Sequence, residues 1–428
     1  MIKQSFLTTF MIAEIIAAGS ELLTPHRQDT NSLYLTQGLN DLGVSVAFKT
    51  IVGDNRAHLT SAIRIALSRA DIVITSGGLG PTEDDLTREC VAEALSLELY
   101  RDPTTMAAIY KRFAERRMAM PPNNEKQAEV IDGAILLPNK NGSAPAQYLD
   151  TTVDSHRKII ILLPGPPKEL KPLFDQAVKP RLAQSLPPRA IAKRILRMAL
   201  IPESTVDART APIYQQFPDI ETTILAGSGE IQLHFTCVKL THEEAQSRVD
   251  ELTELVEAEM GEDIFSSHGE SLEEVVLLML GLQNQTLSLA ESCTGGLLAE
   301  RLTAIPNASR TFTAGIIPYT NAAKTQLAHV PADLLTQYGA VSEPAARALA
   351  EGIRQRTGAS LSLSITGIAG PAIPTDPADA NKPIGLVYIG LADEHDTQVK
   401  QLQIPGDRDR VRLWATQHAL ELLRRRLQ

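Results

Sequence analysis

The 428-residue chain has few aromatic side chains and no excess of positive charge. Aromatic residues make up 4 % of the sequence, which leaves few stacking platforms for a protein that binds single-stranded nucleic acid through its bases. The formal net charge of −10 disfavours non-specific attraction to DNA or to anionic membranes. We therefore expect no membrane binding and no direct nucleic-acid binding, whereas a local basic pocket for a small anion is compatible with this charge.

Cysteine is also scarce, and the three cysteines, Cys90, Cys237 and Cys293, are far apart in the sequence. There is no C-x-x-C pair and no H-E-x-x-H motif, so we expect neither a disulfide framework nor a clustered zinc site. No apolar run reaches the 18 residues that a membrane-spanning helix needs. A reducing cytoplasm is the expected setting. We interpret the first ten residues as a frayed extension, because Glu14 interrupts an apolar run that would otherwise resemble a signal peptide.

The first part of the chain alternates between apolar strand-like runs and amphipathic helical runs. Strands are predicted over 12–18, 44–52, 71–76 and 159–163, and helices over 31–42 and 59–67. This alternation is typical of a parallel sheet covered by helices, whose ligand site lies at the carboxyl ends of the strands.

The middle of the chain, from residue 168 to 262, has a different pattern. Strands are predicted over 195–200, 222–226 and 231–238, with a hairpin turn at 227–229, and helices over 203–216 and 243–260. This pattern indicates a small α+β module.

The last part returns to α/β alternation, with strands over 311–317, 361–366, 386–391 and 398–404. On the final helix we expect His418 to be a packed residue and 424–426, three arginines, to be a solvated helix end. The predicted fold class is α/β: two α/β domains that contain parallel sheets, joined by a small α+β module. The predicted boundaries are 1–168, 169–264 and 265–428.

The stretch 290–296, Ala-Glu-Ser-Cys-Thr-Gly-Gly, is the most informative part of the sequence. It follows a strand-like run and precedes a helical one, so it predicts a sharp glycine-rich turn between them. Such a turn exposes a side chain at the strand's carboxyl end and directs free N–H groups toward a phosphate or a developing oxyanion. Ser292 is therefore a candidate nucleophile. The alternative is a glycine-rich turn in which the serine only caps a helix.

A serine nucleophile needs a group that removes its proton. Lys324 is the candidate base if burial favours its neutral form, and Tyr319 is placed to orient that lysine or relay its proton. A further glycine-rich strand end supplies Thr366, and Arg408 opens the last helix, where it suits a phosphate. Cys293 is an alternative nucleophile, but serine is favoured.

A second glycine-rich segment, 77–88, follows a buried strand and is predicted to open a helix. Gly77 and Gly78 allow the backbone to approach a phosphate, and Thr82 adds a donor. Asp84 and Asp85 at the helix start suit a hard divalent cation of unknown identity, with phosphate oxygens completing its shell. The alternative is that these acids only complement the helix dipole.

The motifs of the last domain resemble the carboxyl-terminal domain of the CinA (competence/damage-inducible protein) family. They are the segments 290–296, 319–324, 339–342, 364–371, 382–385 and 406–408. The resemblance implies a nicotinamide-nucleotide amidase that hydrolyses nicotinamide mononucleotide to nicotinate mononucleotide and ammonia without a cofactor. It implies that Ser292 is acylated, Lys324 is its base and Tyr319 is a supporting hydroxyl. It further implies a substrate-binding set of Thr294, Gly295, Gly296, Asn321, Thr366, Gly367 and Arg408.

The first domain resembles the molybdopterin-binding-like amino-terminal domain of the same family. That resemblance implies a metal-dependent ADP-ribose pyrophosphatase, with Asp85 as the catalytic aspartate, Asp84 and Asp85 as metal ligands, and Gly77, Gly78 and Thr82 contacting substrate. The expected partners are nicotinamide mononucleotide and ADP-ribose, and a homodimer is expected. Two alternatives stay open: a non-catalytic binding protein associated with competence or DNA damage, or a chain in which only one half is active.

Overall fold

The computed structural model describes residues 11–186, 189–227, 229–372 and 376–428. The first ten residues, which we expect to be a frayed extension, lie outside the described residues. The chain divides into two compact units, one formed by Met1–Ile191 with Val238–His242 and the other by Ala192–Cys237 with Glu243–Gln428. The predicted boundaries of three domains remain a prediction.

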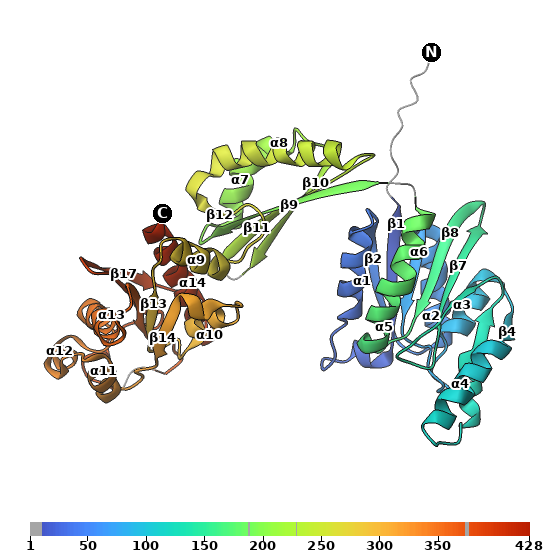
Figure 1. Ribbon diagram of the computed structural model, residues 1–428, viewed down its shortest axis with the longest axis horizontal. Coiled ribbons are helices and arrows are strands. Elements are labelled where there is room, and N and C mark those ends of the chain that lie inside the picture. Colours follow the sequence, from blue (N-terminus) through green and yellow to red (C-terminus); the bar gives the residue numbers. More distant parts are fainter. Residues whose placement is uncertain (1–10, 187–188, 228, 373–375) are drawn as a thin grey trace, which may run out of the picture. The chain divides into compact units, whose positions relative to one another are not determined.

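The first unit is built on a six-stranded mixed sheet of order β2-β1-β3-β8-β7-β6 (Figure 1). Four strands run parallel: β1 (Ile12–Ala18), β2 (Ser45–Val52), β3 (Ile72–Ser76) and β8 (His156–Leu163). Two further strands, β7 (Ala146–Val153) and β6 (Ile135–Leu137), pair antiparallel at one edge. A separate short pair consists of β4 (Leu99–Arg101) and β5 (Glu129–Ile131).

The sheet contains the predicted parallel strands, and the antiparallel edge adds a hairpin that the sequence analysis did not predict. Strands β7 and β8 are joined by the two residues Asp154 and Ser155, whose φ angles are 48° and 64°. Two successive left-handed residues form the kind of tight turn whose twist matches a β-hairpin. The sequence analysis missed the hairpin because this turn lacks the glycine that usually marks it.

Helices cover both faces of this sheet. They are α1 (Asn31–Asn40), α2 (Arg56–Arg69), α3 (Thr87–Leu95), α5 (Pro167–Leu173) and α6 (Lys179–Ser185). The helix α4 (Pro103–Glu115) contributes no residue to the two apolar clusters on these faces, and shorter turns occur at Ser20–Leu23, Pro122–Ala128 and Phe174–Val178. Successive residues of β3 alternate between two apolar clusters, because Ile72 and Ile74 join one and Val73 joins the other. All five residues of β3 are buried, as expected for a central strand with helices on both sides.

The second unit begins with a four-stranded sheet of order β10-β11-β9-β12. Its strands are β9 (Ala190–Ala199), β10 (Ile220–Gly227), β11 (Glu230–Lys239) and β12 (Ile264–Ser266). Two helices, α7 (Glu203–Tyr214) and α8 (His242–Met260), contribute Val206, Val249 and Leu252 to the core that they share with the strands. The predicted α+β character of this region is therefore confirmed.

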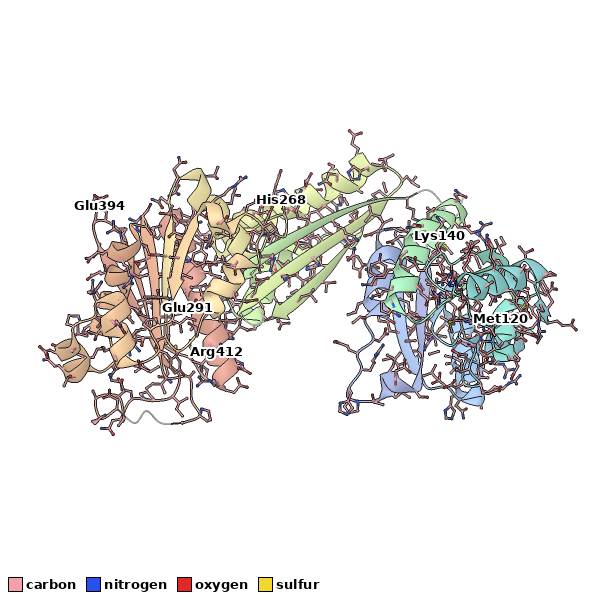
Figure 2. The ribbon with its side chains drawn as sticks, turned by 60° about the horizontal axis from the view of Figure 1, so that its bottom comes forward. Met120, Lys140, His268, Glu291, Glu394 and Arg412 are labelled. Atoms are coloured by element: carbon pink, nitrogen blue, oxygen red, sulfur yellow. The ribbon has the colours of Figure 1, made fainter. Side chains whose placement is uncertain are left out.

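The rest of this unit is a five-stranded sheet of order β14-β13-β15-β16-β17. Strands β13 (Leu287–Glu291), β14 (Phe312–Ile316) and β15 (Leu361–Gly367) run parallel, and β16 (Leu386–Ala392) and β17 (Thr397–Gln403) run antiparallel. The helices are α9 (Leu272–Leu282), α10 (Leu297–Thr303), α11 (Asn321–Ala328), α12 (Ala332–Tyr338), α13 (Glu343–Thr357) and α14 (Arg408–Leu427), with short turns at Gly261–Asp263 and Ala308–Arg310. The carboxyl ends of the three parallel strands meet at one edge, near Glu291 and Arg412 (Figure 2).

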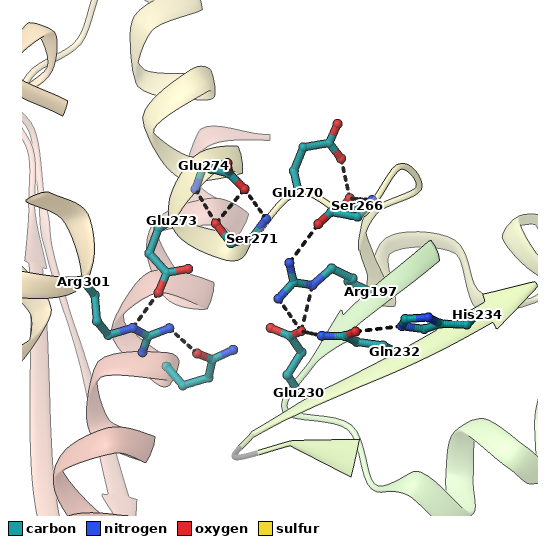
Figure 3. A network of polar contacts seen from close by, with 12 residues as sticks. Arg197, Glu230, Gln232, His234, Ser266, Glu270, Ser271, Glu273, Glu274 and Arg301 are labelled. Carbon is teal, nitrogen blue, oxygen red and sulfur yellow. Dashed lines mark hydrogen bonds and ion pairs between the residues drawn. The ribbon is translucent and has the colours of Figure 1, made fainter. Parts of the chain in front are cut away.

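Polar contacts brace the second unit within its four-stranded sheet and between its helices α9 and α10 (Figure 3). Arg197 on β9 forms an ion pair with Glu230 on β11 at 2.6 Å and donates a hydrogen bond to the carbonyl of Gly269 at 2.9 Å. Farther along, Arg301 on α10 pairs with Glu273 on α9 at 2.6 Å. These side chains are largely removed from solvent, so each pair is worth more than an exposed salt bridge.

The end of α14 differs from the expectation of a solvated arginine run. Arg424 is only 2 % exposed, and its guanidinium binds both carboxylate oxygens of Glu421 at 2.7 and 2.8 Å. It also donates to the carbonyl of Glu262, which lies in the short turn Gly261–Asp263 before β12. The prediction is therefore wrong for Arg424, because this cation links the final helix to the α+β module within the same unit.

Three further expectations from the sequence concern His418, the cysteines and membrane-spanning helices. His418 packs against Trp414, and burial lowers the pKa of His418 to about 4, so the prediction of a packed residue is confirmed. The thiols of Cys90, Cys237 and Cys293 are all buried, and none of the three forms a disulfide within the described residues. Within the described residues, every helix is too short or too polar to cross a membrane.

Candidate active site

The turn after β13 is closed by a buried carboxylate. Glu291, the last residue of the strand, is 2 % exposed and accepts hydrogen bonds from the N–H groups of Leu298 at 3.0 Å and Ala299 at 2.8 Å. These are donors at the start of α10 that a helix leaves unpaired. The sequence analysis expected free N–H groups here, but the protein's own carboxylate occupies two of them.

The two glycines give the turn its shape. Gly295 and Gly296 have φ angles of 60° and 93°, a region that favours glycine. The N–H of Gly295 donates to the carbonyl of Ser292 at 3.1 Å, and Thr294 is fully buried, with its carbonyl bound by Arg412. Thr294, Gly295 and Gly296 do not line the cavity beside Ser292. These three residues build the turn, and their contact with substrate stays a prediction.

Ser292 and Lys324 lie side by side at the carboxyl ends of β13 and β14. The distance from Lys324 Nζ to Ser292 Oγ is 3.1 Å, so the predicted contact between nucleophile and base is confirmed as geometry. Lys324 comes from the first turn of α11, which Thr320 caps by accepting the N–H of Ala323. Ser292 is 7 % exposed and Lys324 is 2 % exposed. Both groups are thus shielded from bulk water while they line the same cavity.

The surroundings of Lys324 favour its neutral amine. Burial lowers the pKa of Lys324, and no carboxylate pairs with it within the described residues. Besides Ser292, its Nζ contacts two carbonyl oxygens, those of Pro318 at 3.1 Å and Tyr319 at 3.2 Å. A neutral amine has two N–H bonds and one lone pair. If the two carbonyls take the two hydrogens, the lone pair faces the Ser292 hydroxyl, as a general base requires.

The side chain of Tyr319 points elsewhere than predicted. Tyr319 is 57 % exposed, and its hydroxyl accepts a hydrogen bond from Arg408 at 3.2 Å. The backbone carbonyl, and not the hydroxyl, contacts Lys324. The expectation that the hydroxyl orients the lysine is therefore corrected. Arg408 also donates to the carbonyl of Gly370 at 2.7 Å, so Tyr319 and Gly370 together hold this exposed cation at the cavity rim.

Thr366 lies at the end of β15 and lines the cavity, as predicted. Its hydroxyl donates to the carbonyl of Ala340 at 2.7 Å, so that proton is not available to stabilise an oxyanion. Gly367 and Asn321 also line the cavity, which agrees with their predicted place in the site. The structure thus brings Ser292, Lys324, Asn321, Thr366, Gly367 and Arg408 around one cavity of about 560 Å³.

Residues 376–382 contribute acids that the sequence analysis did not single out. Asp379 is buried and accepts the N–H groups of Ala340 and Val341 while pairing with Lys382 at 2.7 Å. Asp376 also lines the cavity. Of these contacts, only the ion pair could have been predicted from the sequence. Asp379 and Lys382 are three residues apart, a spacing at which opposite charges can meet.

Cys293 is a weaker candidate nucleophile than its neighbour. Burial raises the pKa of the Cys293 thiol to about 12, and the residue belongs to the apolar cluster under the sheet. The thiolate is the reactive form of cysteine, and such a pKa leaves almost none of it at neutral pH. This environment favours Ser292.

The first unit has a cavity of about 590 Å³ at the carboxyl ends of its parallel strands. Gly77 and Gly78 line it, with φ angles of 103° and 67°. A Cβ on Gly77 would lie 2.2 Å from the carbonyl oxygen of Ala18, so only glycine fits there. Thr87 is buried and donates to the carbonyl of Gly77, which fixes the turn from within. The predicted glycine-rich turn is therefore present beside a cavity.

Thr82, Asp84 and Asp85 also line this cavity. The sequence analysis placed the two aspartates at the start of the helix. In the structure all three residues lie in the turn before α3, which begins at Thr87. Asp85 accepts a hydrogen bond from the N–H of Thr82 at 2.9 Å and another from the Thr82 hydroxyl. No cluster of three or more metal-binding side chains occurs in the part of the chain that the structure describes. The two carboxylates fit a hard cation only if phosphate or water oxygens supply the rest of its shell.

Two solved structures are similar to part of this chain. One is the competence/damage inducible protein CihA from Agrobacterium tumefaciens, with 34 % identity, a TM-score of 0.34, and coverage of 36 % of this chain and 91 % of that one. Another is a protein CinA of unknown function from Thermoplasma acidophilum, with 31 % identity, a TM-score of 0.37, and coverage of 40 % of this chain and 98 % of that one.

Family models and full-length relatives extend the likeness over the whole chain. The model of the CinA C-terminal domain matches residues 269–427, and that of a probable molybdopterin binding domain matches residues 14–184. A CinA-like protein from Acidobacterium capsulatum is 56 % identical over 97 % of this chain and 100 % of its own length. A CinA-like protein from Koribacter versatilis is 52 % identical with the same coverage. A protein with these two domains in this order and these relatives along its length belongs to the CinA family.

Proposed function

We propose that the carboxyl-terminal domain hydrolyses the carboxamide of nicotinamide mononucleotide, giving nicotinate mononucleotide and ammonia. The observation that carries this proposal is the 3.1 Å contact between Lys324 Nζ and Ser292 Oγ, in which the other neighbours of the amine are carbonyl oxygens. A buried serine beside a buried lysine that lacks a carboxylate partner among the described residues is suited to acyl transfer. Arg408 at the cavity rim supplies a cation for the phosphate.

The first half of the reaction acylates the serine. Lys324 takes the proton of the Ser292 hydroxyl while Oγ attacks the carboxamide carbon, which forms a tetrahedral intermediate with a negative oxygen. The intermediate collapses as the C–N bond breaks, and the proton held by Lys324 passes to the departing nitrogen, so ammonia leaves. A nicotinoyl ester of Ser292 remains, and Lys324 is again neutral.

The second half releases the acid. Lys324 removes a proton from a water molecule that attacks the ester carbon, and the second tetrahedral intermediate collapses by breaking the C–O bond to Ser292. The proton on Lys324 returns to Oγ, and the nicotinate product leaves. One lysine serves as base and then as acid in both halves, and burial supports this role because it lowers the pKa of Lys324 and so favours the neutral amine.

The tetrahedral intermediate needs hydrogen-bond donors for its oxyanion. Thr366 and the N–H of Gly295 are already bonded within the protein. The N–H of Cys293 follows the nucleophile directly and takes part in no turn hydrogen bond of the described backbone. We assign the oxyanion to this N–H, because the residue after a serine nucleophile commonly supplies such a donor.

Ammonia release from nicotinamide mononucleotide by the full-length protein tests the amidase. Ser292→Ala is expected to abolish release with the fold intact, because it removes only the attacking oxygen. Circular dichroism and thermal unfolding check the fold. A folded Ser292→Ala protein with parental turnover would refute the proposal.

For the amino-terminal domain we propose metal-dependent hydrolysis of the pyrophosphate of ADP-ribose. The cavity lined by Gly77, Gly78, Thr82, Asp84 and Asp85 supports this proposal, since it combines a glycine-rich turn with two adjacent carboxylates. Asp84 and Asp85 would hold a divalent cation, which neutralises phosphate charge during hydrolysis. Thr82 orients Asp85 through two hydrogen bonds. The three free cysteines agree with a cytoplasmic setting for both activities.

Phosphate release from ADP-ribose, coupled to a phosphatase, tests this second activity with and without added magnesium or manganese. Asp85→Asn is expected to lower it strongly while ammonia release by the other domain stays unchanged. Equal loss of both activities in Asp85→Asn would indicate unfolding, and undiminished hydrolysis would exclude Asp85 from the chemistry.

A further inference from the structure

Two carboxylates line the cavity beside Ser292, and they differ in how far the protein uses them. Asp379 is fully engaged, because it accepts two backbone N–H groups and forms an ion pair with Lys382. Asp376 has no cation partner within the described residues. Its Oδ2 accepts a hydrogen bond from the side-chain amide of Asn321 at 2.7 Å, and its Oδ1 accepts one from the N–H of Ala378 at 3.0 Å.

These two bonds hold the Asp376 carboxylate in place and leave acceptor capacity on both oxygens. An ionised carboxylate has about four lone-pair sites, and two are used. The residue is half-buried in the cavity wall, so its remaining sites need donors from water or from a ligand. Asn321 reaches it from the first turn of α11, the helix that also carries Lys324. The position of Asp376 is thereby tied to the helix that positions the base.

The charges around the cavity restrict how a nucleotide can bind. A phosphate is repelled by Asp376 and attracted by Arg408, which lies at the rim on the first turn of α14. The carboxamide must reach Ser292. The part of a nucleotide between these two groups is the ribose, whose 2′ and 3′ hydroxyls are hydrogen-bond donors. A carboxylate that accepts from ribose hydroxyls is a common solution in nucleotide sites.

We propose that Asp376, held by Asn321, selects the ribose of the substrate by accepting hydrogen bonds from its 2′ and 3′ hydroxyls. This inference rests on the proposed amidase function and assigns a specificity residue to it. The arrangement fixes the nucleotide in one orientation, with the amide at Ser292, the phosphate toward Arg408 and the diol toward Asp376. Amides that lack a ribose, such as free nicotinamide, are poor substrates because they leave Asp376 without donors.

The test compares two substrates in two variants of the full-length protein. The substrates are nicotinamide mononucleotide and its 2′,3′-dideoxy analogue, which keeps the charged ring and the phosphate. The variants are Asp376→Asn, which keeps the size of the side chain, and Glu394→Gln, which removes the same charge from the exposed turn between β16 and β17 (Figure 2). KM and kcat for ammonia release are measured for each pair.

Asp376→Asn is expected to raise KM for nicotinamide mononucleotide on the order of tenfold or more, as for loss of a hydrogen bond to a charged group. Its kcat stays near the parental value, since Ser292 and Lys324 are unchanged. KM for the dideoxy analogue is the same in the parent and in Asp376→Asn, because that analogue never made the contact. Glu394→Gln behaves as the parent with both substrates.

Two results overturn the inference. An equal rise in KM for both substrates means that Asp376 acts on the charged ring or on loop structure, and no rise for either means that it does not contact the sugar. If the parent releases no ammonia at all, the amidase proposal fails. The contact between Asp376 and the sugar is then tested separately, by measuring ligand binding. Calorimetry then compares ribose 5-phosphate with its 2,3-dideoxy form: equal affinity in the parent refutes the contact, and a preference lost in Asp376→Asn supports it.

Discussion

Replacement of Lys324 by methionine separates the chemical role of the amine from its structural role. Methionine keeps an unbranched apolar chain of similar length and removes the group that lies 3.1 Å from Ser292 Oγ. A positioned general base contributes on the order of 10²- to 10⁴-fold to a reaction rate. We therefore expect kcat for ammonia release to fall by about that factor at neutral pH.

The stability change follows from the two carbonyls that Lys324 contacts. The contact with the Pro318 carbonyl is buried, so this oxygen loses a donor that water does not replace, at a cost of about 1–3 kcal/mol. The contact with the Tyr319 carbonyl is only partly buried, so water can satisfy it. Removing the amine also removes its desolvation cost, which offsets part of the loss. The variant is thus expected to stay folded, with a small decrease in the free energy of unfolding.

Ammonia release and urea unfolding are measured on the same protein preparations. Lys400→Met is the matched control, since Lys400 lies on β17 and does not line the cavity. It should retain parental turnover. Parental turnover in folded Lys324→Met would show that another group removes the serine proton, and the reasoning from the lysine's neighbours would then be wrong.

Four further predictions follow from the described contacts. Cys293→Ala should retain most of the ammonia release, because the buried thiol has a pKa of about 12; loss of activity in a folded protein would favour a thiol nucleophile. The kcat/KM of the amidase should rise with pH through the lowered pKa of Lys324, because the protonated amine cannot accept the Ser292 proton; a pH-independent profile would contradict this. If Asp84 and Asp85 hold the proposed cation, EDTA should suppress ADP-ribose hydrolysis and leave ammonia release unchanged. Gly77→Ala should lower the free energy of unfolding by roughly 1–3 kcal/mol in urea titrations, because a Cβ meets a backbone oxygen at a positive φ.

The lowered pKa of Lys324 also makes the free energy of unfolding depend on pH. The pKa of Lys324 is lower in the folded state than in the unfolded chain, so the unfolded chain binds more protons between the lowered value and 10.5. The contribution of Lys324 to the free energy of unfolding therefore increases as pH rises through that window. It is least favourable below the lowered pKa, where the folded protein must hold a buried charge.

The meeting of Ser292 with Lys324 was predictable from strand order alone. Both residues follow apolar runs that become neighbouring parallel strands, with Ala290 opposite Ile316 in the register. The carboxyl ends of parallel strands share an edge, so the residues after them are brought together whatever the loops do. The pattern of small and polar residues after 291 and 317 was therefore sufficient to place the candidate site.

The orientation of Tyr319 was not predictable in the same way. A residue in a turn offers both a side chain and a backbone carbonyl, and the sequence does not say which of them meets Lys324. Here the carbonyl does, and the hydroxyl is drawn to Arg408, which comes from a helix almost ninety positions away. The positions of Asp376 and Asp379 were not predictable for a similar reason. They depend on how a segment without helical or strand periodicity folds back over α11 and the 339–342 turn.

Glycine-rich turns at strand ends suggest anion sites, but in this protein carboxylates already satisfy several of their N–H groups. Glu291 binds two amides of α10, Asp379 binds those of Ala340 and Val341, and Asp407 caps α14. An entering phosphate would have to displace a buried carboxylate from such a position, which is costly. Recognition of a nucleotide phosphate must then depend on a side-chain cation. Arg408 can supply this cation, since it lines the cavity, is exposed, and within the described residues donates only to a carbonyl and a phenol.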